Sequence, residues 1–133
     1  MKPKLPRVPE KVVQQQGVTL LRTLGAKVYV LGTKRRRGDF QGTMQTPGIA
    51  DIFGFLPEKS LTIPRWTPFW WEVKAAGGRL RPEQKDFEAL CQGAYLTHIV
   101  GDLDVLIAFL VRGGWLKADN VPHYRRPAAE VQP

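Results

Sequence analysis

The chain has 133 residues, of which 43% are hydrophobic and 24% charged, a composition typical of one globular domain with a single core. Its single cysteine, Cys91, cannot form an intrachain disulfide and indicates a reducing compartment, and its apolar runs are too short to span a bilayer. These features argue against secreted, membrane and collagen-like classes. They predict a cytoplasmic protein with one domain over residues 1–133, comprising a core at about 8–116 and a polar tail at 119–133.

The net charge of +8 is unevenly distributed along the chain. Residues 1–45 contain ten basic and two acidic side chains, whereas residues 46–133 contain ten of each. A basic excess confined to one segment is typical of a protein that binds a polyanion, most often a nucleic acid. The alternative is that the charge serves only solubility, and the charge alone does not separate the two interpretations.

The first predicted element is an amphipathic helix from Pro9 to about Gly25, because apolar residues recur there at steps of three and four. Gly17 inside this helix marks either a close contact or a break. A strand rich in β-branched and aromatic residues is predicted at 26–32, and a long polar loop at 33–48 follows it.

Three further strands and two helices are predicted downstream: strand 49–55, strand 69–75, helix 81–93, strand 95–100 and helix 102–112. Within helix 81–93 the spacing predicts that Phe87, Leu90 and Cys91 face the core. The first three strands of the chain can pair as hairpins, whereas the helix after the third strand permits a parallel crossover. The expected fold class is therefore α/β, with a mixed central sheet flanked by helices.

Two of the predicted strands carry acidic side chains within apolar runs. Asp51 lies in the second strand, and Glu72 lies between Trp71 and Val73 in the third. A carboxylate among such neighbours costs free energy unless it is paired, protonated or bound to a metal. Lys74 is two residues beyond Glu72 and projects from the same strand face. Two carboxylates are suitable ligands for Mg²⁺, which prefers oxygen.

Other aromatic and polar residues give weaker functional signals. His98 and His123 have no Cys or His at metal-ligand spacing, so no zinc site is expected. Cys91 is predicted to be a small core residue, because nothing near it in the sequence would activate a thiol. The tryptophans of the third strand indicate core packing, although Trp66, placed in a predicted loop, could contact DNA.

The ordered set of motifs resembles the PD-(D/E)XK nuclease superfamily and, within it, the VRR-Nuc family. The resemblance consists of the G-I-A-D strand at 48–51, the W-E-V-K strand at 71–74, and Gln84 one turn into the following helix. E-V-K alone is a common sequence, whereas the ordered set on strand, strand and helix is more specific. Pro47 is separated from Asp51 by three residues, which departs from the Pro-Asp pair of the broad superfamily.

The resemblance covers the predicted core and implies a divalent-metal-dependent endonuclease with a restriction-endonuclease-like fold. It implies that Asp51, Glu72 and the backbone carbonyl of Val73 bind Mg²⁺ or Mn²⁺. Lys74 would be the catalytic lysine, and Gln84 would face the site from its helix and orient a water or a ligand.

Several of these implied roles have structural alternatives. Glu10 matches the N-terminal glutamate of the family and would approach the same metal, or it is a first-turn acid favoured by the helix dipole. Gln84 would instead cap its own helix. Glu72 and Lys74 would form an exposed ion pair if their strand lies at a sheet edge, and Asp51 would cap a turn.

Basic side chains accompany the predicted site. One group precedes the strand that carries Asp51 and consists of Lys34, Arg35, Arg36 and Arg37. A second group follows the strand that carries Glu72 and consists of Arg79, Arg81 and Lys85. They are expected to contact DNA phosphates, the alternative for the first group being a solvated basic loop. No segment resembles a base-reading helix, so cutting at a defined sequence is not expected.

The resemblance to standalone VRR-Nuc proteins implies that four-way (Holliday) junctions are the substrate. Resolution of such a junction takes two cuts, so a homodimer acting on branched DNA is expected. The alternatives are a nuclease for flaps, nicks or ordinary duplex, which would act as a monomer or beside a helicase or replication protein. Outside catalysis, the alternatives are a DNA-binding module without activity and a basic protein that binds RNA or a protein partner.

Overall fold

The structure is a computed structural model that describes residues 8–31, 46–58 and 62–121. Its elements, in chain order, are α1 (Glu10–Thr23), β1 (Lys27–Val30), β2 (Ile52–Pro57), β3 (Trp66–Val73), α2 (Pro82–Gly93), β4 (Thr97–Gly101), α3 (Leu103–Arg112) and the short 3₁₀ helix η1 (Ala118–Asn120). The described strands form one sheet in the order β1-β2-β3-β4. The pairs β1–β2 and β2–β3 are antiparallel and β3–β4 is parallel, so the sheet is mixed.

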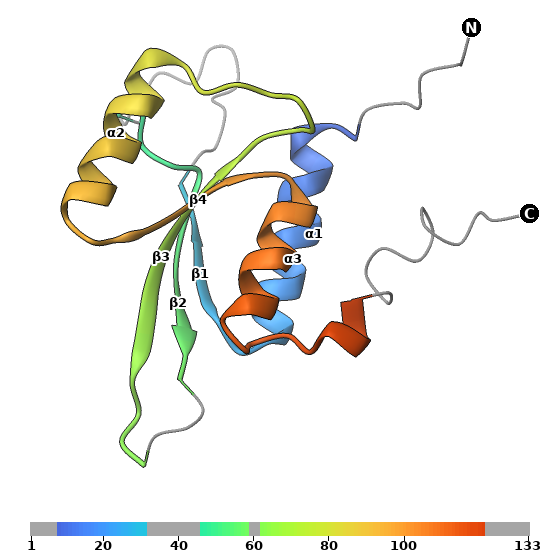
Figure 1. Ribbon diagram of the computed structural model, residues 1–133. Helices are drawn as coiled ribbons and strands as arrows, with labels where there is room; N and C mark the ends of the chain where they lie inside the picture. Colours follow the sequence, from blue (N-terminus) through green and yellow to red (C-terminus); the bar gives the residue numbers. More distant parts are fainter. Residues whose placement is uncertain (1–7, 32–45, 59–61, 122–133) are drawn as a thin grey trace, which may run out of the picture.

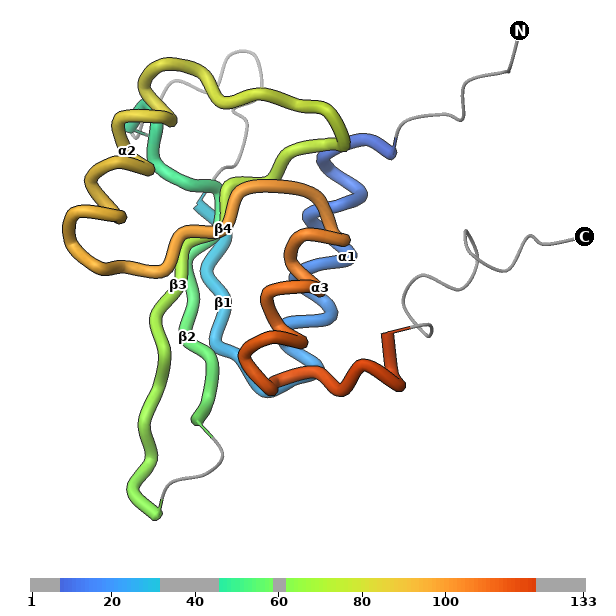
Figure 2. The backbone as a smooth tube through the Cα atoms, in the orientation of Figure 1, coloured from blue at the N-terminus to red at the C-terminus, as the bar shows by residue number. Residues whose placement is uncertain are grey.

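Helices lie on both sides of this sheet. Figure 1 shows α1 and α3 side by side on one face, here called the inner face, and α2 over one end of the opposite, outer face. The tube view in Figure 2 shows that the far end of the β2–β3 hairpin extends beyond all three helices. The predicted α/β class with a mixed sheet flanked by helices is confirmed, and the arrangement is consistent with a restriction-endonuclease-like core.

The hydrophobic core lies between the inner face and the pair α1 and α3. Its most buried large side chains are Leu20 and Leu21 of α1, Ile52 and Leu56 of β2, Phe69, Trp71 and Val73 of β3, and Leu106 and Leu110 of α3. Trp71 also donates a hydrogen bond from its indole Nε1 to the carbonyl of Gly101, at 3.1 Å. The bulkiest residue of the core therefore ties β3 to the end of β4.

Helix α1 runs without interruption through Gly17, which resolves the question raised by that glycine. A Cβ at Gly17 would collide with the ring of Trp71 and would lie 3.0 Å from a methyl group of Leu106. The glycine therefore marks a close contact between α1 and the sheet and not a break. The helix begins after Pro9 and is followed by Gly25, whose φ of +91° suits a glycine after a helix.

The strand boundaries differ from the predicted ones. Strand β2 begins at Ile52, so Asp51 immediately precedes the strand, and β3 already begins at Trp66. Proline cannot donate to a sheet ladder, so the sequence predicts that the strand begins only after Pro68. Pairing of β3 with β4 begins only at Phe69, so Pro68 lies where β3 has a neighbour on one side alone.

The prediction for helix α2 is only partly right. Cys91 is buried, and Phe87 packs with its ring 5.1 Å from Trp70 and 5.5 Å from His98. Leu90 is 71% exposed, so its prediction as a core residue is wrong. The physical reason is that α2 packs one narrow stripe against the end of the sheet, and none of the other described helices covers its opposite side.

The sequence also predicts that no segment spans a membrane, that residues 119–133 form a polar tail, and that a basic run lies in the loop at 33–48. Within the part of the chain that the structure describes, no helix is both long and apolar enough to cross a bilayer. The predicted tail opens with η1 and with Val121, which is partly buried against the core, and residues 122–133, including His123, lie outside the described residues. The basic run at 34–37 also lies outside them.

Candidate metal centre

Glu72 lies in the interior of the sheet. Its strand β3 pairs with β2 on one side and with β4 on the other, and its side chain is only 3% exposed. It stands on the outer face, two residues beyond Trp70 and beneath the start of α2. The alternative in which Glu72 and Lys74 form an exposed ion pair on an edge strand is therefore wrong.

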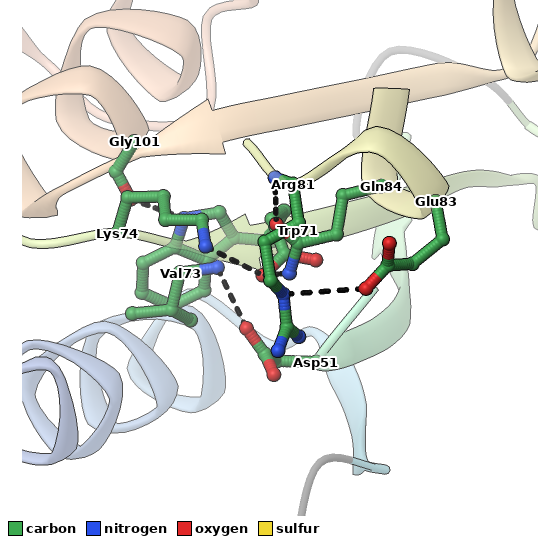
Figure 3. Close-up of polar contacts among 9 residues, drawn as sticks. Asp51, Trp71, Val73, Lys74, Arg81, Glu83, Gln84 and Gly101 are labelled. Atoms are coloured by element: carbon green, nitrogen blue, oxygen red, sulfur yellow. Dashed lines mark hydrogen bonds and ion pairs between the residues drawn. The ribbon is translucent and has the colours of Figure 1, made fainter. Parts of the chain in front are cut away.

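Asp51 is brought to Glu72 by the register of the β2–β3 hairpin. Ile52 pairs with Trp71, so continuing the antiparallel register by one residue puts Asp51 opposite Glu72. The Asp51 carboxylate accepts a hydrogen bond at Oδ2 from the backbone amide of Val73, at 3.0 Å (Figure 3). Asp51 therefore ties the end of β3 to the start of β2, and its side chain is oriented toward Glu72.

Gln84 holds the Glu72 carboxyl from the other side. Its Nε2 donates to Glu72 Oε2 at 3.1 Å, and its Oε1 accepts the backbone N–H of Arg81 at 2.8 Å. The second bond satisfies a free donor at the start of α2, as in a capping box. The two alternatives for Gln84, facing the site and capping its helix, are both realised because its amide has a donor end and an acceptor end.

Lys74 lies just beyond the end of β3, on the same face as Glu72. Its Nζ is 4.0 Å from Glu72 Oε2, and its side chain is 12% exposed. The backbone amide of Lys74 donates to the Gly101 carbonyl at 3.0 Å, which fixes the residue against β4. A cation, two carboxyl groups and an amide therefore converge at the end of β3 (Figure 3).

The ionisation of Glu72 reflects this crowding. Its pKa is raised from 4.5 to about 8, mainly by burial and further by the hydrogen bond with Asp51 and the negative charge of Asp51. Lys74 acts in the opposite direction and lowers the pKa, without cancelling the other effects. At neutral pH the carboxyl is therefore mostly protonated, the usual result when two carboxyl groups share one site.

Glu10 contributes to the same electrostatic field from α1. It is the first residue of that helix and exposed, where the positive end of the helix dipole favours an acid. Its charge also raises the pKa of Glu72. The role of Glu10 as a metal ligand stays a prediction.

The chemistry of the donor set fits a hard divalent cation. Asp51 and Glu72 offer carboxylate oxygens, and their mutual repulsion when both are ionised would be relieved by a positive ion between them. The described residues contain no cluster of three or more His, Cys, Asp or Glu side chains able to hold a metal. An ion held by Asp51 and Glu72 would keep waters at its other positions, as Mg²⁺ usually does in proteins. The carbonyl of Val73 stays a predicted ligand.

Exposed basic residues surround the start of α2. Arg81 is 68% exposed and pairs its Nε with Glu83 Oε1 at 3.5 Å, and Arg79 and Lys85 are also exposed. Figure 3 shows the ion pair of Arg81 with Glu83 at the start of α2. Their contacts with DNA stay predictions.

Gly48, the first residue of the G-I-A-D motif, has a structural role in the site. It has a φ of +90°, and a Cβ there would collide with the backbone carbonyl of Glu83 in α2. The segment that carries Asp51 is therefore packed directly against α2, which carries Gln84. The Pro47-Gly48 dipeptide, typical of turns, was the available signal.

No family model, no curated protein and no solved structure matches this chain. The resemblance to VRR-Nuc nucleases stays a prediction from the motifs.

Proposed function

We propose that this protein is a divalent-metal-dependent endonuclease that hydrolyses phosphodiester bonds in DNA. The observation that carries the proposal is the Glu72 carboxyl, 3% exposed on an internal strand and in contact with Asp51, Lys74 and Gln84. A buried carboxyl whose pKa is strongly raised, next to a second carboxyl and a lysine, is characteristic of functional sites.

Asp51 and Glu72 are the side chains that would hold the ion. When bound, Mg²⁺ or Mn²⁺ would polarise the phosphodiester and lower the pKa of a bound water. The Val73 amide orients the Asp51 carboxylate, and the Gln84 amide orients that of Glu72. The ammonium group of Lys74 would stabilise the negative charge that develops on the phosphate oxygens.

The charge distribution supports DNA as the substrate, with phosphate contacts from Arg79, Arg81, Lys85 and the basic run at 34–37. Among DNA substrates we favour branched forms, with a homodimer making the two cuts that a four-way junction needs. Flapped, nicked and linear duplexes are the alternatives.

The test is a cleavage panel with end-labelled four-way junction, flap, nicked duplex and linear duplex, each in EDTA, Mg²⁺ or Mn²⁺. We expect cleavage only with metal, and a fall of about 100-fold or more in Lys74→Met, because that variant keeps the length of the side chain and removes its charge. Lys117→Met is the matched control, since Lys117 is exposed, directly precedes η1 and is not among the residues that contact Asp51 or Glu72.

Metal-dependent cutting that persists unchanged in Lys74→Met would contradict the role of Lys74. Mass measurement of the native protein, alone and with junction DNA, tests the homodimer separately. A monomer that cuts flaps and not junctions would favour the alternative substrates.

A second candidate is a DNA-binding module without catalytic activity. It is supported by the hydrogen bond from Gln84 to Glu72, which satisfies the protonated carboxyl without any ion. Calorimetric titration with Mg²⁺ and Mn²⁺ separates the candidates. Binding that is lost in Asp51→Asn supports the nuclease, and absence of binding supports the module.

A further inference from the structure

The outer face of the sheet carries aromatic rings on three adjacent strands. Side chains alternate along a strand, so the residues opposite to the core positions lie together on this face. They include Tyr29 of β1, Phe53 and Phe55 of β2, and Trp66 and Trp70 of β3. Tyr29 is 52% exposed and Trp66 is 44% exposed, and the other three are partly buried. This set is called the aromatic face below.

The rings form a continuous row across the strands. The ring of Tyr29 stacks on that of Phe53 with centroids 6.5 Å apart, and Phe53 is 4.6 Å from Trp70. Trp70 is covered in turn by Phe87 of α2 at 5.1 Å. The row is therefore covered by α2 at the Trp70 end and open at Tyr29, which is 52% exposed on β1, the first strand in the order of the described sheet.

Charge on the aromatic face favours an anionic partner. At the outer-face positions of the described strands β1 to β3, the charged side chains are Lys27, which is exposed, and Glu72, which is buried under α2. The exposed part of the face thus combines flat rings with a cation, within a chain of net charge +8. Rings that stack on bases beside cations that contact phosphates are the usual means of holding single-stranded nucleic acid.

The aromatic face also leads to the candidate metal centre. Trp70 and Glu72 project from the same face of β3 and are two residues apart, about 7 Å along a strand. A polynucleotide that lay across the row would therefore approach the carboxylates from the open end at Tyr29.

We propose that the aromatic face binds unpaired nucleotides of the DNA substrate by stacking, so that the preferred substrates contain a single-stranded segment beside the cleaved bond. The inference rests on the proposed nuclease function for its link to cleavage. The stacking itself does not depend on catalysis, because Tyr29 and Trp66 lie outside the metal centre.

The experiment measures binding in EDTA, where cleavage is absent, by fluorescence anisotropy with labelled oligothymidine and a blunt duplex of the same length. We expect Tyr29→Ala to weaken oligothymidine binding about 5- to 100-fold and to leave duplex binding nearly unchanged. Tyr29→Phe retains the ring and should bind as the wild type does. The matched control is Tyr95→Ala, since Tyr95 is 96% exposed in the turn that leads from α2 into β4, and β4 is at the opposite end of the sheet order from β1, which carries Tyr29.

Photocrosslinking with an oligonucleotide that contains 5-iodouracil gives an independent readout. We expect the crosslinked peptides to contain Tyr29, Phe53 or Phe55. The proposal is overturned if Tyr29→Ala binds oligothymidine as the wild type does, or if Tyr95→Ala weakens it equally. It is also overturned if Tyr29→Ala turns a dimer into a monomer without affecting single-strand binding, which would assign the face to a second copy of the chain.

The outcomes separate this inference from the proposed function. Single-strand binding that depends on Tyr29, in a protein that cuts no DNA with either metal, would support stacking and reject the nuclease. Metal-dependent cutting of substrates with single-stranded segments that is unchanged in Tyr29→Ala would support the nuclease and reject the stacking.

Discussion

At the scale of single residues, the central feature is the proton held by Glu72. Water is excluded from its carboxyl by β2, β4 and α2, and the adjacent Asp51 adds a negative charge. The neutral form avoids the cost of burying two adjacent charges, and the Gln84 amide still bonds to it. A divalent ion at this site would therefore have to displace a proton as well as water.

The raised pKa of Glu72 predicts how stability depends on pH in the metal-free protein. The folded state keeps the proton up to about pH 8, whereas the unfolded chain loses it near 4.5. Between these values the folded state binds more protons, so the free energy of unfolding should fall as pH rises and should level off above about 8. Urea unfolding in EDTA over this range measures the effect.

Glu72→Gln is the matched variant for this measurement, because it cannot titrate and keeps the shape of the side chain. Its stability should lack the component that declines between pH 4.5 and 8. Identical pH profiles for the two proteins would show that Glu72 titrates near its ordinary value.

At the scale of elements, the hairpin of β2 and β3 does most to assemble the site. The periodicity of the sequence predicted four strands, three main helices and their order, and these agree with the structure except at the ends of the strands. Turn residues and apolar spacing are local signals, so they are readable in a single sequence. The predicted placement of Glu72 on a strand and Gln84 on a helix is also confirmed, whereas Asp51 immediately precedes its strand.

The environment of each side chain was harder to predict than the elements. The internal position of β3 depends on a parallel pairing with β4 across the whole of α2, which no local pattern specifies. Leu90 follows helical spacing and is nevertheless exposed, because the spacing does not say how many sides of a helix are covered. The row from Tyr29 to Trp70 was likewise not predicted, since aromatic residues in strands usually indicate a core.

The contact between α1 and the sheet gives a prediction at this scale. Gly17→Ala should reduce the free energy of unfolding by about 1–3 kcal/mol, because the added methyl group would collide with the ring of Trp71, which is fully buried. The gain in helix propensity of about 1 kcal/mol would not offset a collision of that size. Gly93→Ala in α2 is the control, since no atom lies within 4 Å of a Cβ there, and it should be neutral or slightly stabilising. Urea denaturation compares both with the wild type, and equal stabilities for the two variants would contradict the close contact.

At the scale of the whole molecule, charge and chemistry occupy different parts of the chain. The N-terminal third contributes the net positive charge, and the neutral remainder contributes Asp51, Glu72 and Lys74. Phosphate contacts are expected to hold the DNA without reading its sequence. Affinity and catalysis should therefore respond to different substitutions.

The proposed phosphate contacts predict how binding depends on salt. In EDTA, the affinity for duplex DNA should fall linearly on a log–log plot as salt increases, with a slope of about 0.9 per phosphate contact. Arg79→Ala should reduce the slope by about one contact. Arg112→Ala, at the end of α3, removes the same charge outside the proposed interface and should leave the slope unchanged. Anisotropy titrations at several salt concentrations give the slopes, and equal slopes for wild type and Arg79→Ala would remove that residue from the interface.

The opposed positions of Asp51 and Glu72 have a consequence for how this chain can vary. The two carboxylates meet because Ile52 pairs with Trp71, whatever the length of the turn at the other end of the hairpin. Insertions or deletions in that turn would preserve the site, whereas a slip of β2 along β3 by one residue would separate the carboxylates. The same slip would turn Leu56 and Ile52 out of the core, so misfolded hairpins would lose stability together with function. In this molecule a single register of β2 on β3 both buries the core side chains and brings Asp51 opposite Glu72. A chain that folds with the correct core therefore also has the correct site.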